Sequence, residues 1–150
     1  MTKTELAKAV IKKYGEQNQA YKMIEEGAEL TAALCRLKIG QFVQDHVAEE
    51  MADCYLVLNQ MDTIFGKITE KEERLLDNIK DSISIMSVIG DTQSWLSDFM
   101  HEEFDTKRLK ECFYFFRKKL NELSAKIGEE KVNAWIERKS ERMIHRLENS

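Results

Sequence analysis

The sequence contains no proline and only six glycines among its 150 residues. Proline and glycine supply many of the tight turns and helix breaks in proteins. A β-sandwich or a doubly wound sheet needs many such turns, so both architectures are excluded. The chain is instead rich in Glu, Lys, Leu, Ile and Ala, which are common in helices. This composition predicts an all-α protein, and the length suits one compact domain over residues 1–150.

Long apolar stretches are also missing. No segment approaches the ~20 apolar residues that a membrane-spanning helix needs, and the lysines near the N-terminus are not followed by the apolar run of a secretory signal. The three cysteines, Cys35, Cys54 and Cys112, show no C-x-x-C spacing. An odd number of cysteines without a framework indicates reduced thiols. We therefore expect a cytoplasmic protein that makes no contact with a membrane.

Charge is unevenly distributed along the chain. Residues 1–106 hold 11 basic and 20 acidic side chains, a balance of −9, whereas residues 107–146 hold 12 basic and 6 acidic ones, a balance of +6. An acidic part and a basic part predict sites for a cation and an anion, respectively. Because the basic residues alternate with acidic ones, as on an ordinary helix surface, we expect no binding to nucleic acid.

Apolar residues recur at intervals of three and four along most of the chain, which is the helical period. Two start signals are specific: Thr69 precedes Glu72 with the spacing of a capping box, and Asp105 is placed as an N-cap. Asp91 is interpreted as a further cap, after a break at Gly90. The expected helices form an antiparallel bundle and span about 2–14, 18–37, 42–65, 69–90, 91–99, 105–127 and 130–147.

Six acidic residues mark the second and third expected helices. Glu25, Glu26 and Glu29 form E-E-x-x-E on one helix, and the next helix carries the E-E-x-x-D of Glu49, Glu50 and Asp53. Residues three or four apart share a helix face. If the chain turns at Gly40, an antiparallel hairpin places Glu29 level with Glu50, and Glu26 level with Asp53. The acidic groups should therefore converge between the two helices.

Such a convergence is destabilising unless a cation compensates the charge. Carboxylate oxygens without thiolate or imidazole ligands favour Mg²⁺ or Mn²⁺ over zinc. The alternative is an acidic face that simply contacts solvent, but the matched spacing on both helices favours the metal site. A di-iron carboxylate bundle is a poor alternative, because it uses Glu-x-x-His pairs and the sequence has none.

The same residues resemble the signature of the MazG-like superfamily of all-α nucleoside triphosphate pyrophosphohydrolases. The signature is E-x-x-E, a gap and E-x-x-D, matched here by Glu26-Gly27-Ala28-Glu29 and Glu50-Met51-Ala52-Asp53. The resemblance is good over residues 14–66, the expected metal-binding and catalytic hairpin. It is loose over residues 129–147 of the basic C-terminal segment, residues 129–150. There Lys139 and Arg142 match the family's K-x-x-R pattern, and Arg146 matches its second arginine one turn later. Residues 67–128 match nothing in the family. We interpret the chain as a short, phage-type member with an extra helical segment, either inserted or a degenerate second copy.

The resemblance implies hydrolysis of a nucleoside triphosphate between the α and β phosphates, giving a monophosphate and pyrophosphate. It implies that Mg²⁺, or Mn²⁺ as a substitute, is held by Glu26, Glu29, Glu50 and Asp53. Glu25 or Glu49 would be catalytic, accepting a proton from the attacking water. The residues expected to bind substrate phosphates are Lys22, Lys139, Arg142 and Arg146.

Two further expectations concern partners. A two-helix hairpin cannot enclose a triphosphate and a base alone, so we expect a homodimer or a homotetramer. A different class of function also fits the sequence: a non-catalytic helical protein that retains the metal site and binds a protein partner through residues 67–128. Release of pyrophosphate that depends on metal would separate the enzyme from the binding protein.

Overall fold

The computed structural model describes residues 1–40, 44–78, 83–99, 101 and 103–149. Within these residues the protein is all-α, with seven helices and no strand. None of these helices is both long enough and apolar enough to cross a membrane. Their bounds are α1 Lys3–Tyr14, α2 Glu16–Lys38, α3 Gln44–Phe65, α4 Glu70–Asp77, α5 Ile85–Phe99, α6 Thr106–Ile127 and α7 Glu129–Glu148.

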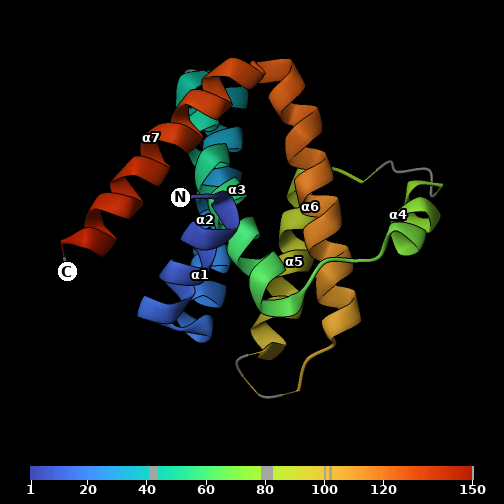
Figure 1. The fold of residues 1–150 in the computed structure, drawn as a ribbon. Helices are drawn as coiled ribbons and strands as arrows, with labels where there is room; N and C mark the ends of the chain where they lie inside the picture. Colours follow the sequence, from blue (N-terminus) through green and yellow to red (C-terminus); the bar gives the residue numbers. More distant parts are fainter. Residues whose placement is uncertain (41–43, 79–82, 100, 102, 150) are drawn as a thin grey trace.

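Helix α3 is the centre of the bundle. It pairs with α2 as an antiparallel hairpin and also contacts α1, α6 and α7. Figure 1 shows α1 and α7 on one side of this hairpin and the α5–α6 pair on the other, with α4 standing away from the bundle. Consistent with that position, α4 has no buried residue. The hairpin is therefore covered on both sides by helices that come from distant parts of the sequence.

One hydrophobic core runs through α2, α3, α5, α6 and α7. Met51 and Leu58 of α3 are completely buried, as are Leu96 of α5 and Leu109 and Leu120 of α6. Burial of a side chain of this size contributes about 1.5–3 kcal/mol. The unmatched segment, residues 67–128, thus supplies two helices of the core through α5 and α6 and is not a separate appendage.

The starts of α4 and α6 follow the caps predicted at Thr69 and Asp105, and α1 begins after Thr2, close to its predicted start. Thr2 Oγ1 accepts a hydrogen bond from the Glu5 amide at 3.1 Å while Glu5 Oε2 accepts one from the Thr2 amide at 3.1 Å, and Thr69 makes the same reciprocal arrangement with Glu72. The Asp105 side chain accepts from the amide three residues later at 3.1 Å. The predicted start of the third helix at residue 42 or 43 lies outside the described residues.

The predicted break at Gly90 is wrong. Instead of one helix over residues 69–90 and another capped by Asp91, α4 ends at Asp77 and α5 runs without interruption through Gly90. The reason is tertiary packing, since Ile89 and Leu96 on either side of the glycine are both buried against the hairpin and α6. Their burial outweighs the roughly 1 kcal/mol that a helical glycine costs.

Two other glycines position the helices around the hairpin. Gly128 has φ +127° and is the single residue between α6 and α7, so the chain reverses there and α7 returns along α3 (Figure 1). Gly27 lies at the contact of α2 with α5, where a Cβ atom would lie 3.1 Å from Ile89 Cγ2. Its missing side chain brings α5 close behind the acidic residues of α2.

Candidate metal centre and the adjoining cavity

The four predicted metal ligands come together in the structure. Glu26 and Glu29 of α2 and Glu50 and Asp53 of α3 each offer one carboxylate oxygen, and these oxygens all lie within 4.8 Å of one another. Glu26 is buried, Glu50 and Asp53 are half-buried and Glu29 is exposed. The antiparallel register predicted from the turn at Gly40 thus produces the expected convergence of charge.

Proximity and burial change the acidity of this carboxylate cluster, which comprises Glu26, Glu29, Glu50 and Asp53. Desolvation, followed by the charges of Asp53 and Glu29, raises the pKa of Glu26 to about 8. The same causes raise the pKa of Glu50 to about 7. Burial also raises the pKa of Asp53, although Lys139 opposes that shift. The cluster therefore holds protons near neutral pH when no metal ion neutralises it.

The donor set fits a hard divalent cation. Glu26 Oε2 and Glu50 Oε2 are buried and have no hydrogen-bond partner within the described ranges. Unsatisfied buried carboxylate oxygens are costly, and four carboxylates form the oxygen-only coordination that Mg²⁺ and Mn²⁺ accept. His46, one turn before Glu50 on α3, lies 3.7 Å from the Glu50 carboxylate and so sits at the edge of the cluster.

Lys139 is a cation that α7 places against the cluster. Its Nζ atom on α7 lies 2.9 Å from both carboxylate oxygens of Asp53 and 3.5 Å from Glu49 Oε2. Burial acts to lower the pKa of Lys139, but the hydrogen bond to Asp53 and the neighbouring acidic charges outweigh it and raise the pKa. The lysine therefore carries a full positive charge.

The predicted bases differ in their surroundings. Glu25 lines a cavity next to the cluster and accepts a hydrogen bond from Lys22 at 3.1 Å. Glu49 does not line this cavity and contacts Lys139 instead. Lys22 also lies 3.9 Å from Glu26, and its hydrogen bond to Glu25 is the main reason that its pKa is raised. Lys22 and Glu25 thus face the same cavity from α2.

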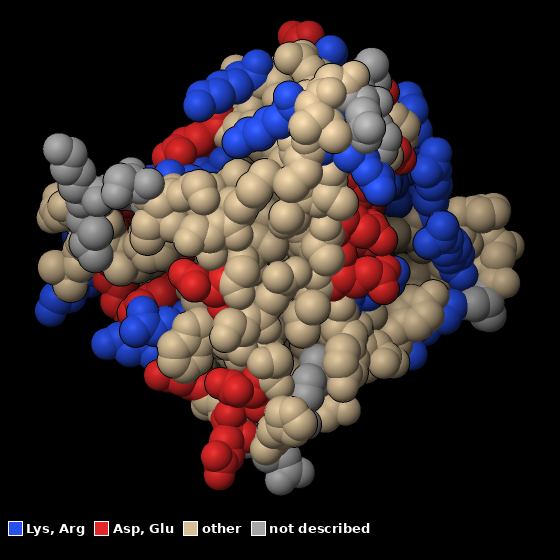
Figure 2. All heavy atoms as spheres, turned by 180° about the vertical axis from the view of Figure 1, so that it is seen from behind, with Lys and Arg blue, Asp and Glu red and all other residues tan. Residues whose placement is uncertain are grey.

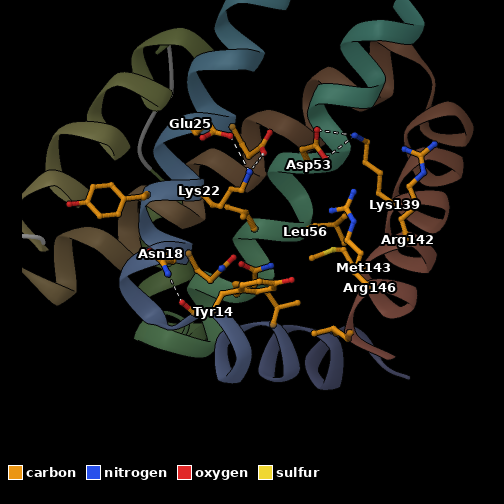
Figure 3. Close-up of a pocket in the computed structure, with 17 residues that line it drawn as sticks. Tyr14, Asn18, Lys22, Glu25, Asp53, Leu56, Lys139, Arg142, Met143 and Arg146 are labelled. Atoms are coloured by element: carbon orange, nitrogen blue, oxygen red, sulfur yellow. Dashed lines mark hydrogen bonds and ion pairs between the residues drawn. The ribbon is translucent and has the colours of Figure 1, made fainter. Parts of the chain in front are cut away.

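This cavity has a volume of about 590 Å³, is open to solvent on one side and is lined by residues of α1, α2, α3 and α7. Glu26 and Asp53 line it at the end nearest the cluster. Figure 3 shows Lys139 reaching from α7 toward Asp53 of α3, with Arg142 and Arg146 farther along the same helix; all three line the cavity. Since α7 rises about 1.5 Å per residue, Arg146 lies about 10 Å beyond Lys139 along the helix axis. One chain supplies these walls, and the homodimer or homotetramer stays a prediction.

The charges on this side of the molecule are segregated. Figure 2 shows acidic side chains gathered beside a band of lysines and arginines, with a hollow between them. The carboxylate cluster lies on α2 and α3, whereas Lys139, Arg142 and Arg146 all lie on α7. The uneven charge found along the sequence is thus folded into a surface with an acidic wall facing a basic one.

Sequence reasoning missed the polar residues at the other end of the cavity. Asn18, Gln19 and Gln60 line it there. Gln19 and Gln60 are 5% and 1% exposed, which is unusual for glutamine. The signal was present in the sequence, because the register that places Glu26 level with Asp53 also places Gln19 level with Gln60.

Comparisons of the chain with protein-family models, with curated proteins and with solved structures found no significant match.

Proposed function

We propose that the protein is a Mg²⁺-dependent nucleotide pyrophosphohydrolase that cleaves a nucleoside or deoxynucleoside triphosphate between its α and β phosphates. The products are a nucleoside monophosphate and pyrophosphate. The observation that supports this proposal best is the convergence of four carboxylate oxygens within 4.8 Å, two of whose residues, Glu26 and Asp53, line a cavity of about 590 Å³. Cavities of this size are typical of small-molecule sites.

Each part of the site has a chemical role in this proposal. A metal ion held by Glu26, Glu29, Glu50 and Asp53 supplies charge neutralisation at the phosphate oxygens. Lys139 contacts the cluster from α7, Arg142 lines the cavity, and both would pair with phosphate oxygens that reach it. Glu25 is the better candidate for the base, because it lines the cavity whereas Glu49 does not.

The resemblance to the MazG-like superfamily supports the same reaction through the residues of α2 and α3. In that interpretation α5 and α6 act as the support for the hairpin. Ile89 packs against α2 at Gly27, and Gln93 Nε2 donates a hydrogen bond to the Ile24 carbonyl at 3.0 Å. The segment from 67 to 128 therefore positions the acidic helix from behind.

The test is release of pyrophosphate from a panel of canonical and modified nucleoside triphosphates, with Mg²⁺, with Mn²⁺ and with a chelator. We expect turnover that depends on metal and is lost in the double variant Glu50→Gln, Asp53→Asn. The matched control is Asp98→Asn with Glu130→Gln, which makes the same charge change at exposed positions of α5 and α7.

Two outcomes contradict the proposal. Turnover that survives in the double variant would place the reaction elsewhere in the molecule. No turnover with any nucleotide, in protein that still binds Mn²⁺ by calorimetry, would favour the non-catalytic alternative, in which residues 67–128 bind a protein partner. The exposed α4, with Leu75 61% exposed, would then be the first surface to mutate.

A further inference from the structure

The cavity has two chemically different ends. At one end lie Glu26 and Asp53 of the carboxylate cluster, and at the other Gln19 of α2 lies level with Gln60 of α3 in the register of the hairpin. Seven residues separate the two levels on each helix, which corresponds to about 10 Å along the axis. That separation is comparable with the distance from the phosphates to the base edge in a nucleotide.

The glutamine end holds an unsatisfied hydrogen-bond acceptor. Gln60 is 1% exposed, and its Oε1 atom has no partner in the part of the chain that the structure describes. An apolar side chain at this position would avoid the loss of stability that an unpaired buried carbonyl brings. Other atoms of Gln60 line the cavity, so a rotation of its carboxamide would bring Oε1 to a donor on a ligand there.

The walls around the glutamines suit a flat heterocycle. Tyr14 of α1, Leu56 and Val57 of α3 and Met143 of α7 provide apolar surface. In Figure 3, Tyr14 and Asn18 lie at the end of the cavity away from Asp53. Asn18 donates through Nδ2 to the Tyr14 carbonyl at 2.6 Å, which ties α2 to the end of α1. Apolar faces with a few polar groups at one edge are the usual environment of a bound planar ligand.

We propose that Gln19 and Gln60 recognise the hydrogen-bonding edge of the substrate's base, with Gln60 Oε1 accepting from a ring N–H or an exocyclic amino group. This inference rests on the proposed function, because it takes the ligand to be a nucleotide whose phosphates lie at the carboxylate end. A carboxamide presents a carbonyl beside an NH₂ group, so it pairs with a base edge that carries a donor beside an acceptor. Gln60 is thus assigned as a residue that determines base specificity.

The test compares Gln60→Met, which keeps the length of the side chain and removes its hydrogen bonds, with Gln17→Met, an exposed control on α2. Steady-state pyrophosphate release is measured for triphosphates of all the common bases, with inorganic tripolyphosphate as a competitor that lacks a base. For Gln60→Met we expect kcat/KM for the preferred base to fall about 10–100-fold. The inhibition constant of tripolyphosphate and the thermal midpoint should not fall.

A Gln60→Met variant that keeps the base preference of the parent protein, with kcat/KM within twofold, overturns the inference and leaves the proposed function intact. If no nucleotide is hydrolysed, the proposed function fails, and the inference is then judged by calorimetric binding of nucleosides and of non-hydrolysable triphosphate analogues. Equal affinity of parent and variant, or no binding at all, overturns it. Should Gln60→Met fail to fold, Gln19→Met is compared with Gln17→Met in the same assays.

Discussion

Lys139 on α7 and Asp53 on α3 are 86 positions apart in the sequence, yet the lysine Nζ lies 2.9 Å from both oxygens of the carboxylate. A positive charge therefore already occupies the position beside a proposed metal ligand. Two cations near one carboxylate repel each other. Lys139 and a divalent ion are thus competitors for Asp53, while a bound triphosphate gives the lysine a second anionic partner.

Replacing Lys139 with Met should raise the affinity for Mn²⁺ and lower the rate of hydrolysis. Removal of the competing charge favours the ion by about tenfold at low salt, whereas loss of a phosphate contact weakens binding of the transition state. Isothermal calorimetry of the free protein measures the first effect, and pyrophosphate release measures the second. Lys131→Met, at an exposed position of the same helix, is the control. An unchanged affinity for Mn²⁺ would show that the lysine does not compete.

The metal-free protein should lose stability as the pH rises from about 4.5 to about 8. The ordinary pKa of a glutamate side chain is 4.5. Burial and the neighbouring charges raise the pKa of Glu26 to about 8 and that of Glu50 to about 7. The folded protein therefore binds more protons than the unfolded chain in this range, and the free energy of unfolding falls until both groups are ionised.

Chemical denaturation at pH 5, 6, 7 and 8 with a chelator measures this dependence. Glu50→Gln removes one titrating group and should make the slope shallower, while Glu130→Gln on the exposed face of α7 should leave it unchanged. A free energy of unfolding that rises with pH in the metal-free parent protein would contradict the raised pKa values of Glu26 and Glu50.

Divalent metal should reverse the loss of folding stability that occurs as the pH rises. Metal binding needs the ionised carboxylates, so Mg²⁺ or Mn²⁺ should stabilise the protein more at pH 8 than at pH 6. A ligand at one hundred times its dissociation constant adds about 2.7 kcal/mol, which corresponds to roughly 5–10 °C for a chain of this size. Thermal unfolding with and without chelator measures the shift. The shift should vanish in the double variant of Glu50 and Asp53, and its persistence there would place the ion elsewhere.

Substitution of two glycines inside helices should change the free energy of unfolding in opposite directions. Gly27→Val introduces atoms against Ile89, whose Cγ2 would already lie 3.1 Å from a Cβ, so we expect a loss of about 1–3 kcal/mol. Gly90→Ala places its Cβ in open space on the exposed face of α5 and should gain about 0.5–1 kcal/mol. Denaturant unfolding measures both. Equal changes in the free energy of unfolding would contradict the close contact of α2 with α5.

The carboxylate cluster was predictable because it depends on two local facts. The period of the helix places Glu26 with Glu29, and Glu50 with Asp53, and one turn near Gly40 sets the register between the helices. Neither fact needs knowledge of the rest of the chain. The caps at Thr2, Thr69 and Asp105 were predictable for the same reason.

Features that depend on tertiary packing were not predictable from the sequence. Gly90 looks like a helix end, and only the burial of Ile89 and Leu96 explains why α5 continues through it. The return of Lys139 to Asp53 likewise depends on the reversal at Gly128, whose direction no local pattern specifies. The register contained the pairing of Gln19 with Gln60, but their burial follows from α1 and α7, which close the cavity.

The position of α7 also has a consequence for biosynthesis. Lys139 follows Asp53 by 86 positions, and at ~5–20 residues per second a ribosome needs roughly 4–17 s to add them. During that interval Asp53 lacks the lysine that neutralises it in the folded protein. Only cations from the surrounding solution can then neutralise Asp53 while the hairpin pairs. If the hairpin pairs during synthesis, its carboxylates meet before the last helix arrives with Lys139.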